Sequence, residues 1–339
     1  MRNKYRELLS SSFFSVYTGY MKTEKIQIFK PEEYHYTGNG TFIPTLKTYL
    51  HDDGKKRPAI IVCPGGAYRY TTPAEAHLPA MYFFHHDFQA FVLQYSVNVL
   101  NDTPLLDQPM HDLARAIRFI RKNSDFFHID PDQVVILGFS AAGHLCASVS
   151  IYYEKIRDTD PSYNAISARP DLTLLGYPVI TMKEFTHQGT KEALLGKSAD
   201  TDAVEKYSLE DHVHEDMAPV FLFHTVTDEA VPAENSLLFV KALKAHHVPF
   251  ALHLFSHGQH GLSAANEDWA HGHYPNDTFD ALLSVKEILK KKEPDRKVQQ
   301  ETAYLDSIIN KDRSQRTANH EVSAWMDLAM EFAKEQLSL

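Results

Sequence analysis

Short apolar runs alternate with amphipathic helical patterns along most of this chain. The run at 59–63 (AIIVC) has no polar interruption, which is typical of a strand buried on both faces of a parallel sheet. Between such runs, residues 107–122 and 237–246 repeat apolar side chains at helical spacing. The runs that predict strands are 45–50, 59–63, 90–95, 134–137, 172–175, 220–223 and 250–255. Repeated strand–helix–strand units predict an α/β fold, with a mostly parallel central sheet and helices on both faces.

The chain shows no clear division into domains. Its 339 residues suffice for one large domain or two ordinary ones, but no linker rich in Pro, Gly or Ser separates two halves. We expect a single domain over 23–339 after an N-terminal tail at 1–22. The polar segments 154–170 and 180–217 follow core strands, where α/β enzymes carry loops that cover the site. A last amphipathic helix is expected around Trp325.

Composition excludes several classes of protein. With 43% hydrophobic residues and a net charge of −10, the chain can build a core and has no electrostatic reason to bind nucleic acid or anionic lipid. No apolar run reaches the roughly 20 residues that cross a bilayer, and residues 1–20 lack a signal-peptide pattern. Cys63 and Cys146 lie in apolar runs and predict buried thiols. These features predict a cytoplasmic globular protein.

A nucleophile is predicted where the run at 134–137 continues into Gly138-Phe139-Ser140-Ala141-Ala142. Small residues flank Ser140, because a strand that turns directly into a helix brings backbone atoms close together. The match is G-x-S-x-A, whereas the usual pattern is G-x-S-x-G. A serine that caps a helix after a glycine turn would give the same string. The strand before Ser140 and the helix after it favour the nucleophile.

A second glycine-rich turn, Pro64-Gly65-Gly66, follows the run at 59–63. Backbone N–H groups stabilise a tetrahedral oxyanion only where the chain can approach it closely. We expect the N–H groups of Gly65 or Gly66, together with that of Ala141, to form an oxyanion hole. An ordinary tight turn would have a similar sequence, so this prediction depends on the nucleophile downstream.

The acid and base of a triad are predicted after the next core strands. Asp228 follows the run at 220–223, although an aspartate there could also cap the next helix, and Glu229 is a rival acid. His260 follows the run at 250–255 on a loop with nearby glycines, and His257 is a rival base. The chain order Ser140, Asp228, His260 is the one found in α/β-hydrolases.

Several segments together resemble a known family. RPAIIVCPGGAY, IDPDQVVILGFSAAGHL and VPFALHLFSHGQHGLS are similar to the α/β-hydrolase fold serine esterases, specifically the acetyl esterase and acetyl xylan esterase-like group near the hormone-sensitive-lipase-type enzymes. The resemblance runs from about 45 to 263 and resumes near 321. It implies Ser140 as nucleophile, His260 as base, Asp228 as orienting acid and Gly65, Gly66 and Ala141 as oxyanion donors, with no metal or organic cofactor.

The chain departs from the family pattern in three places. Ala67 and Ala142 stand where the family usually has glycine, and we expect them to alter the acyl pocket rather than abolish activity. The segment 264–320 is longer than the family's link between the histidine loop and the last helix. It is therefore predicted to be an insertion beside the active site, and the residues leave open whether it is a lid, a dimer contact or inert.

The predicted function is hydrolysis of small acyl esters, above all acetyl esters, through an acyl-enzyme intermediate. Two alternatives stay open: a serine peptidase of prolyl-peptidase type, and a catalytically silent hydrolase-fold binding protein. A third uses His257 and His260, or His271 and His273, as metal ligands, but no cysteine or carboxylate set completes either pair. We expect His144 to pack or hydrogen-bond within its helix. The expected partner is a small-molecule ester, with no nucleic acid or membrane, and self-association into a homo-oligomer is left open.

Overall fold

The computed structural model describes residues 16–18, 21–36, 38, 42–311 and 316–339. Within these ranges, ten strands form one sheet in the order β1-β2-β4-β6-β5-β7-β8-β9-β10, and β3 pairs with β4. Neighbouring strands are parallel throughout the part β6-β5-β7-β8-β9-β10, and β4 pairs with β6 in the antiparallel direction. The bounds are β1 Val16–Thr18, β2 Met21–Thr23, β3 Lys25–Gln27, β4 Thr45–His51, β5 Arg57–Cys63, β6 Gln89–Gln94, β7 Ile129–Phe139, β8 Leu172–Gly176, β9 Val220–Thr225 and β10 Phe250–Phe255.

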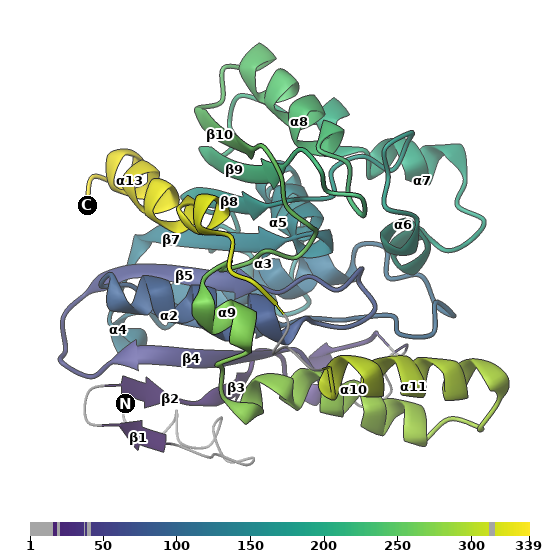
Figure 1. Cartoon of the computed structure of the whole chain (residues 1–339). Coiled ribbons are helices and arrows are strands. Elements are labelled where there is room, and N and C mark those ends of the chain that lie inside the picture. Colours follow the sequence, from purple (N-terminus) through teal and green to yellow (C-terminus); the bar gives the residue numbers. More distant parts are fainter. Residues whose placement is uncertain (1–15, 19–20, 37, 39–41, 312–315) are drawn as a thin grey trace.

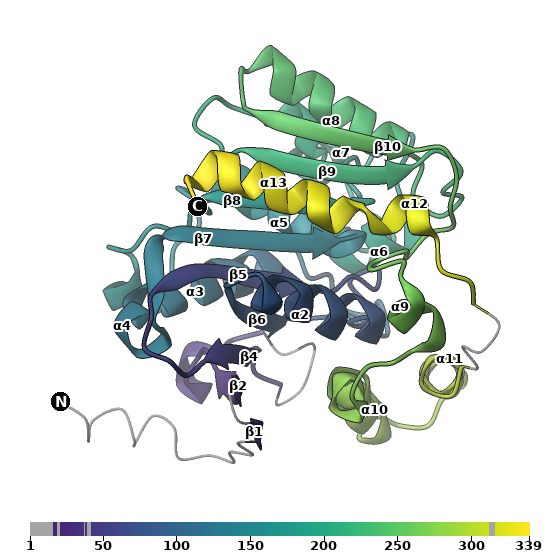
Figure 2. The same ribbon diagram turned by 60° about the vertical axis from the view of Figure 1, so that its left-hand side comes forward.

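Helices cover both faces of the sheet (Figures 1 and 2). One core contains side chains of α3, α5 and α8, and the other contains side chains of α2 and α13. The α-helices are α2 His77–His85, α3 Gln108–Lys122, α4 Ser124–Phe127, α5 Ala141–Tyr152, α6 Gln188–Leu195, α7 Thr201–Lys206, α8 Glu234–Ala245, α9 Glu267–His271, α10 Asp280–Lys290, α11 Arg296–Ile309, α12 His320–Ser323 and α13 Trp325–Leu337. The 3-10 turns are η1 Pro31–Glu33, η2 Pro73–Glu75, η3 Pro161–Tyr163, η4 Leu209–Asp211 and η5 Asn276–Phe279.

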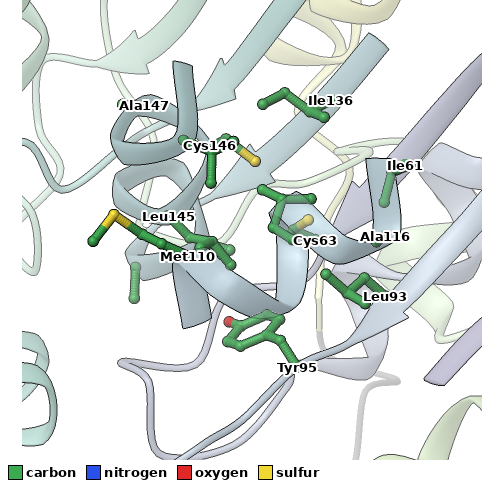
Figure 3. Packing of buried hydrophobic residues seen from close by; sticks show 14 of the residues in the cluster. Ile61, Cys63, Leu93, Tyr95, Met110, Ala116, Ile136, Leu145, Cys146 and Ala147 are labelled. Carbon is green, nitrogen blue, oxygen red and sulfur yellow. The ribbon is translucent and has the colours of Figure 1, made fainter. Parts of the chain in front are cut away.

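Cys63 at the end of β5 and Cys146 on α5 lie in the packed core (Figure 3). Both thiols are free and buried, which confirms the sequence prediction. A Cβ placed at Gly138 would lie 2.7 Å from the sulfur of Cys146. The end of β7 is therefore packed too closely against α5 to accept a side chain at this position.

All seven predicted strands are present, and so are the predicted helices at 107–122, 237–246 and around Trp325. The prediction that 180–217 is a loop is wrong in part, because α6, α7 and η4 lie within it. These helices are short: six residues in α7 and eight in α6. A helix of only about two turns shows too few repeats for its apolar spacing to be recognised.

Residues 1–15 of the predicted tail, with 19–20, lie outside the described residues. Within 1–22, Val16–Thr18 pairs antiparallel with the strand that begins at Met21, and this strand in turn pairs with β4. The described part of this segment therefore extends the sheet, whereas no strand was predicted there. The segment 264–320, which stays an insertion only as a prediction, contains α9, η5, α10 and α11.

Helices α10 and α11 lie side by side, next to the β3–β4 edge of the sheet (Figures 1 and 2). Lys47 of β4 forms an ion pair of 2.7 Å with Asp277 of η5, and this contact ties the segment to the sheet. Across the described ranges, no helix combines the length and the apolar character that crossing a bilayer would require.

Candidate active site

Ser140 lies at the sharp turn between β7 and α5. Its backbone has φ 55° and ψ −121°, a conformation that costs a non-glycine residue about 1–3 kcal/mol. Two backbone hydrogen bonds hold the turn: Ser140 N–H donates to the carbonyl of Gly176 at 2.9 Å, and Val179 N–H donates to that of Ser140 at 3.0 Å. A Cβ at Gly138 would lie 2.1 Å from the carbonyl oxygen of Ala142. The small residues around Ser140 are therefore required by the close approach of β7 and α5.

The structure brings Ser140, His260 and Asp228 into one hydrogen-bonded line. Nε2 of His260 is 2.9 Å from Oγ of Ser140, and Nδ1 is 2.7 Å from Oδ2 of Asp228. Ser140, Asp228 and His260 follow β7, β9 and β10, so all three reach the carboxyl edge of the parallel strands. The side chain of Asp228 is 1% exposed and that of His260 is 25% exposed, so the imidazole is the part of this line that solvent reaches.

The carboxyl group of Asp228 is ionised despite its burial. Burial opposes ionisation, but the N–H groups of His224 and His260 that face the carboxylate outweigh it and hold the pKa of Asp228 well below its usual range. Its Oδ1 also accepts the N–H groups of Ala230 at 3.0 Å and Val231 at 2.9 Å. An ionised Asp228 keeps the imidazole proton on Nδ1, and Nε2 can then accept a proton from Ser140.

His224 is a second histidine beside Asp228, and sequence reasoning missed it. It is fully buried in β9. Its Nε2 donates to the carbonyl of Val231 at 2.9 Å and lies 3.6 Å from Oδ2 of Asp228, while Nδ1 accepts from the hydroxyl of Ser236 at 2.8 Å. The proton on Nε2 therefore faces the carboxylate. A histidine inside an apolar strand, four residues before the acid, was the available signal.

The two rival residues lie outside this line. Glu229 is exposed to solvent, next to Asp228. The side chain of His257 is 71% exposed, and its Nδ1 lies 2.8 Å from Oγ of Ser256 and 3.9 Å from Glu321. Among the two candidate acids and two candidate bases, Asp228 and His260 share a hydrogen bond that continues to Ser140.

The glycine loop after β5 only partly fits the predicted oxyanion hole. The N–H of Gly65 donates to Oε2 of Glu75 at 2.6 Å, so this N–H already has an acceptor within the protein, and of the two predicted glycine donors the contact favours Gly66. Within the described part of the chain, no protein group accepts the N–H of Gly66 or of Ala141. These two groups stay the candidate donors. The local sequence around Gly65 gave no sign that its N–H would donate to Glu75, ten positions later.

The same loop has three successive residues in the left-handed region. Gly66, Ala67 and Tyr68 have φ values of 131°, 55° and 58°. Ala67, where the family usually has glycine, therefore has the backbone strain that a Cβ causes in the left-handed region. Ala142, the other departure, is fully buried in α5.

His144 anchors the glycine loop from α5. Its Nδ1 accepts from the hydroxyl of Tyr68 at 3.1 Å, and its Nε2 donates to the carbonyl of Tyr207 at 2.9 Å. The expectation that His144 bonds within its own helix is thus incomplete, because both of these partners lie outside α5. Burial lowers the pKa of His144 to about 4, so the ring is neutral near pH 7.

His187, at the start of α6, is a further histidine near the site. It accepts the N–H of Thr190 at 3.2 Å through Nδ1. A Cβ at Gly189 would lie 3.2 Å from the His187 ring and 3.9 Å from Cβ of Ala67, which places the start of α6 against the glycine loop. Burial and the nearby His260 lower the pKa of His187. Sequence reasoning treated this segment only as a loop that covers the site.

Two cavities border the loops of the site. One, of about 470 Å³, is lined by Tyr70, Tyr274 and Tyr304 among others. The second, of about 660 Å³, lies along the histidine loop from His257 to Gln259 and the segment before α12. Among the residues that the structure describes, no three His, Cys, Asp or Glu side chains are placed to hold a metal ion.

The chain is similar to several known proteins. A family model described as BD-FAE matches residues 46–243, more than half of the chain. The chain is 40% identical over 258 residues to Endo-1,4-beta-xylanase B from Butyrivibrio fibrisolvens, covering 75% of this chain and 41% of that protein. It is 26% identical over 230 residues to an acetylxylan esterase from Xylanibacter ruminicola, covering 63% and 45%. The chain therefore spans less than half the length of these two curated relatives.

The chain is also similar to a solved structure. The acetyl ester-xyloside bifunctional hydrolase from Caldicellulosiruptor lactoaceticus is 36% identical, with a TM-score of 0.66, and the match covers 78% of this chain and 95% of that chain. The family match includes the glycine loop, Ser140 and Asp228. The chain therefore belongs to the BD-FAE family, and its fold is that of the α/β-hydrolases.

Proposed function

We propose that the chain is a serine esterase that hydrolyses esters of small acyl groups, above all acetyl esters. The observation that carries the proposal is the line from Asp228 through His260 to Ser140, with separations of 2.7 and 2.9 Å. Relatives named as an acetylxylan esterase and an acetyl ester-xyloside hydrolase support the acyl group. In this proposal, Ser140 is the nucleophile, His260 the general base and Asp228 the acid that orients the imidazole.

The proposed reaction has two steps that share one histidine. Nε2 of His260 accepts the hydroxyl proton of Ser140 while Oγ attacks the ester carbonyl carbon. The N–H groups of Gly66 and Ala141 hold the oxyanion, and the N-terminus of α5 adds a favourable dipole. His260 then gives its proton to the departing alcohol. In the second step, water loses a proton to His260 and attacks the acyl carbon, and Ser140 leaves as its hydroxyl when His260 returns the proton.

The proposed alcohol is a sugar hydroxyl. The cavity of about 470 Å³ beside the glycine loop is lined by Tyr70, Tyr274 and Tyr304. A tyrosine offers an apolar ring face and a polar hydroxyl together, which suits the apolar faces and hydroxyl edges of sugar rings. The hydroxyls of Tyr70 and Tyr304 are hydrogen-bonded to each other at 3.0 Å, and both residues belong to the lining of this cavity.

The decisive experiment is hydrolysis of p-nitrophenyl acetate by the purified wild-type chain and by Ser140→Ala. Removing Oγ removes the attacking atom, so we expect kcat to fall to background while the far-UV circular dichroism spectrum is unchanged. Ser256→Ala, on the exposed histidine loop, is the matched control and should keep wild-type kcat. Retained hydrolysis in Ser140→Ala would refute the proposal.

The choice of substrate is tested with a second set of esters. We expect kcat/KM to fall as the acyl chain of p-nitrophenyl esters lengthens from acetyl to octanoyl. At equal acetyl concentration, an acetylated xylo-oligosaccharide should be hydrolysed faster than ethyl acetate. Equal rates on both esters would contradict the sugar as the alcohol but would leave the esterase proposal unaffected. Cleavage of a prolyl p-nitroanilide without ester hydrolysis would point to a peptidase.

A further inference from the structure

Glu75 is a buried carboxyl group next to the proposed site. It lies at the end of η2 and is 3% exposed. Its two oxygens accept from two different neutral donors: Oε2 from the N–H of Gly65 at 2.6 Å, and Oε1 from the hydroxyl of Tyr177 at 2.9 Å. A buried carboxyl group is costly unless its oxygens accept hydrogen bonds. An apolar side chain would fill the same space without that cost, so packing alone does not explain Glu75.

The first contact fixes the glycine loop against the nucleophile turn. Gly65 is held at both of its backbone polar groups, because its carbonyl accepts the N–H of Thr72 at 2.8 Å. A Cβ at Gly65 would lie 2.5 Å from the carbonyl oxygen of Phe139, 2.9 Å from Oε2 of Glu75 and 3.0 Å from Cβ of Ser140. The loop therefore rests directly on the residues around Ser140. A shift of Gly65 would move the N–H of the next residue, Gly66, relative to Oγ.

The second contact reaches the imidazole. The ring of Tyr177 meets the ring of His260 edge-on, with centroids 4.9 Å apart and an interplanar angle of 69°. Tyr177 is 2% exposed, and its N–H donates to the carbonyl of Phe223 at 2.7 Å. Its backbone φ of 36° is in the left-handed region. The hydroxyl bond to Glu75 thus holds a ring that forms one wall beside His260.

We propose that Glu75 is a positioning residue that sets the oxyanion donor of Gly66 and, through Tyr177, the imidazole of His260 for attack by Ser140. The proposal rests on the proposed function and adds to it a residue outside the line of Asp228, His260 and Ser140. Glu75 does not touch the reacting atoms. It acts on kcat through geometry, and a displacement of about 1 Å in such a site lowers the rate by up to about 100-fold.

Burial raises the pKa of Glu75, and the nearby His260 and the two hydrogen bonds act in the opposite direction. Because these effects oppose one another, a pH profile alone does not isolate the role of Glu75. We therefore test that role with substitutions that change its hydrogen-bond acceptors. Glu75→Leu removes both acceptors and keeps the volume. Glu75→Gln keeps a carbonyl oxygen that can accept from Gly65, but it puts an amide N–H2 group where Oε1 accepts from Tyr177, so the bond to the Tyr177 hydroxyl has to reverse its direction.

The experiment measures kcat per active site, titrated by the burst of p-nitrophenol from p-nitrophenyl acetate. We expect Glu75→Leu to lower this kcat by about 10- to 100-fold and Glu75→Gln by about 3- to 10-fold, with KM changed less than about threefold. If Glu75→Leu does not fold, Glu75→Gln decides. The matched control is Asp112→Asn. Asp112 lies on α3, is also fully buried and accepts hydrogen bonds from two neutral residues, Ser96 and Gln108. Asp112→Asn should keep kcat per active site.

A merely structural role would lower the melting temperature or the titrated fraction and leave kcat per active site at the wild-type value. That result, in Glu75→Gln and in any folded Glu75→Leu, would overturn the proposal. Loss of hydrolysis in Ser140→Ala is measured first. Because that loss establishes the esterase reaction independently, unchanged kcat in the Glu75 variants counts against the positioning role and not against the proposed function.

Discussion

Arg69 and Glu301 form an ion pair between the glycine loop and α11, across 232 positions of sequence. Beside it, the rings of Tyr70 and Tyr304 meet edge-on with centroids 5.9 Å apart. The guanidinium of Arg69 also lies over the ring of Tyr304 at 5.7 Å. The segment 264–320 therefore contacts the loop that carries the proposed oxyanion donor, and a change in α11 can reach the site through Arg69.

The first prediction concerns this ion pair. Glu301→Gln removes the charge that holds Arg69, and with it part of the restraint on the loop from Gly66 to Tyr70. Both side chains are about one-fifth exposed, at 22% and 18%, so solvent screens the pair. We expect kcat/KM for p-nitrophenyl acetate to fall about three- to tenfold, which corresponds to about 1 kcal/mol.

The matched control for Glu301→Gln is Glu287→Gln on α10. Glu287 pairs with Lys290 on the surface of its own helix, with both side chains 61% exposed. The control should keep wild-type kcat/KM and melting temperature. Equal effects of the two substitutions would show that the ion pair with Arg69 does not act on the loop.

The second prediction concerns Asp228. Asp228→Asn keeps the shape of the side chain but removes the charge that holds the imidazole proton on Nδ1. The wrong tautomer then presents a proton to Ser140, and we expect kcat to fall by about 10³- to 10⁴-fold. Glu229→Gln is the control next in sequence, and it should stay within twofold of wild type. Normal kcat in Asp228→Asn would exclude its proposed role.

The sequence predicted those parts of the site that depend on local order along the chain. Ser140, Asp228 and His260 each follow an apolar strand, and parallel strands bring their carboxyl ends to one edge of the sheet. The apolar runs were clear enough to place all seven predicted strands. Residue type, position after a strand and chain order were therefore sufficient to predict that these three side chains lie close together.

The partners of these residues could not be predicted in the same way. Glu75 meets Tyr177 across 102 positions, and no local pattern records such a contact. The sequence Pro64-Gly65-Gly66 shows that the backbone can turn sharply, but not which acceptor takes the N–H of Gly65. Contacts of this kind depend on how the loops pack in three dimensions, and that packing leaves no periodic signal.

The third prediction is that His144 makes the fold sensitive to acid. Burial lowers its pKa to about 4, from an ordinary value of 6.5. Between these values the unfolded chain binds a proton that the folded chain does not. The stability from a neutral His144 is therefore present above pH 6.5 and is lost as the pH falls to 4. The loss amounts to about 3 kcal/mol in the free energy of unfolding.

His144→Gln tests this sign. The amide can still bond to Tyr68 and to the carbonyl of Tyr207, but it does not titrate. We expect the wild type to lose about 3 kcal/mol of unfolding free energy relative to the variant between pH 7 and pH 4, measured by urea unfolding at each pH. A difference that is constant with pH would mean that His144 is protonated alike in both states.

The fourth prediction has the opposite sign and concerns Asp112 on α3. Burial raises its pKa to about 6 from 3.8, although hydrogen bonds from Ser96 and Gln108 act against the rise. Between these two values the folded chain keeps a proton that the unfolded chain has released. Asp112 therefore contributes less stability as the pH rises from 4 to 6, and the difference is about 3 kcal/mol.

Asp112→Asn separates this effect from that of His144, because each variant is compared with the wild type at the same pH. The amide loses one acceptor, so we expect the variant to be less stable than the wild type at pH 4. As the pH rises to 7.5, the ionised carboxylate becomes costly only in the wild type, and the gap should shrink by about 3 kcal/mol. A gap that widens with pH would mean that Asp112 is stabilised as the carboxylate in the fold, with its hydrogen bonds from Ser96 and Gln108 outweighing its burial.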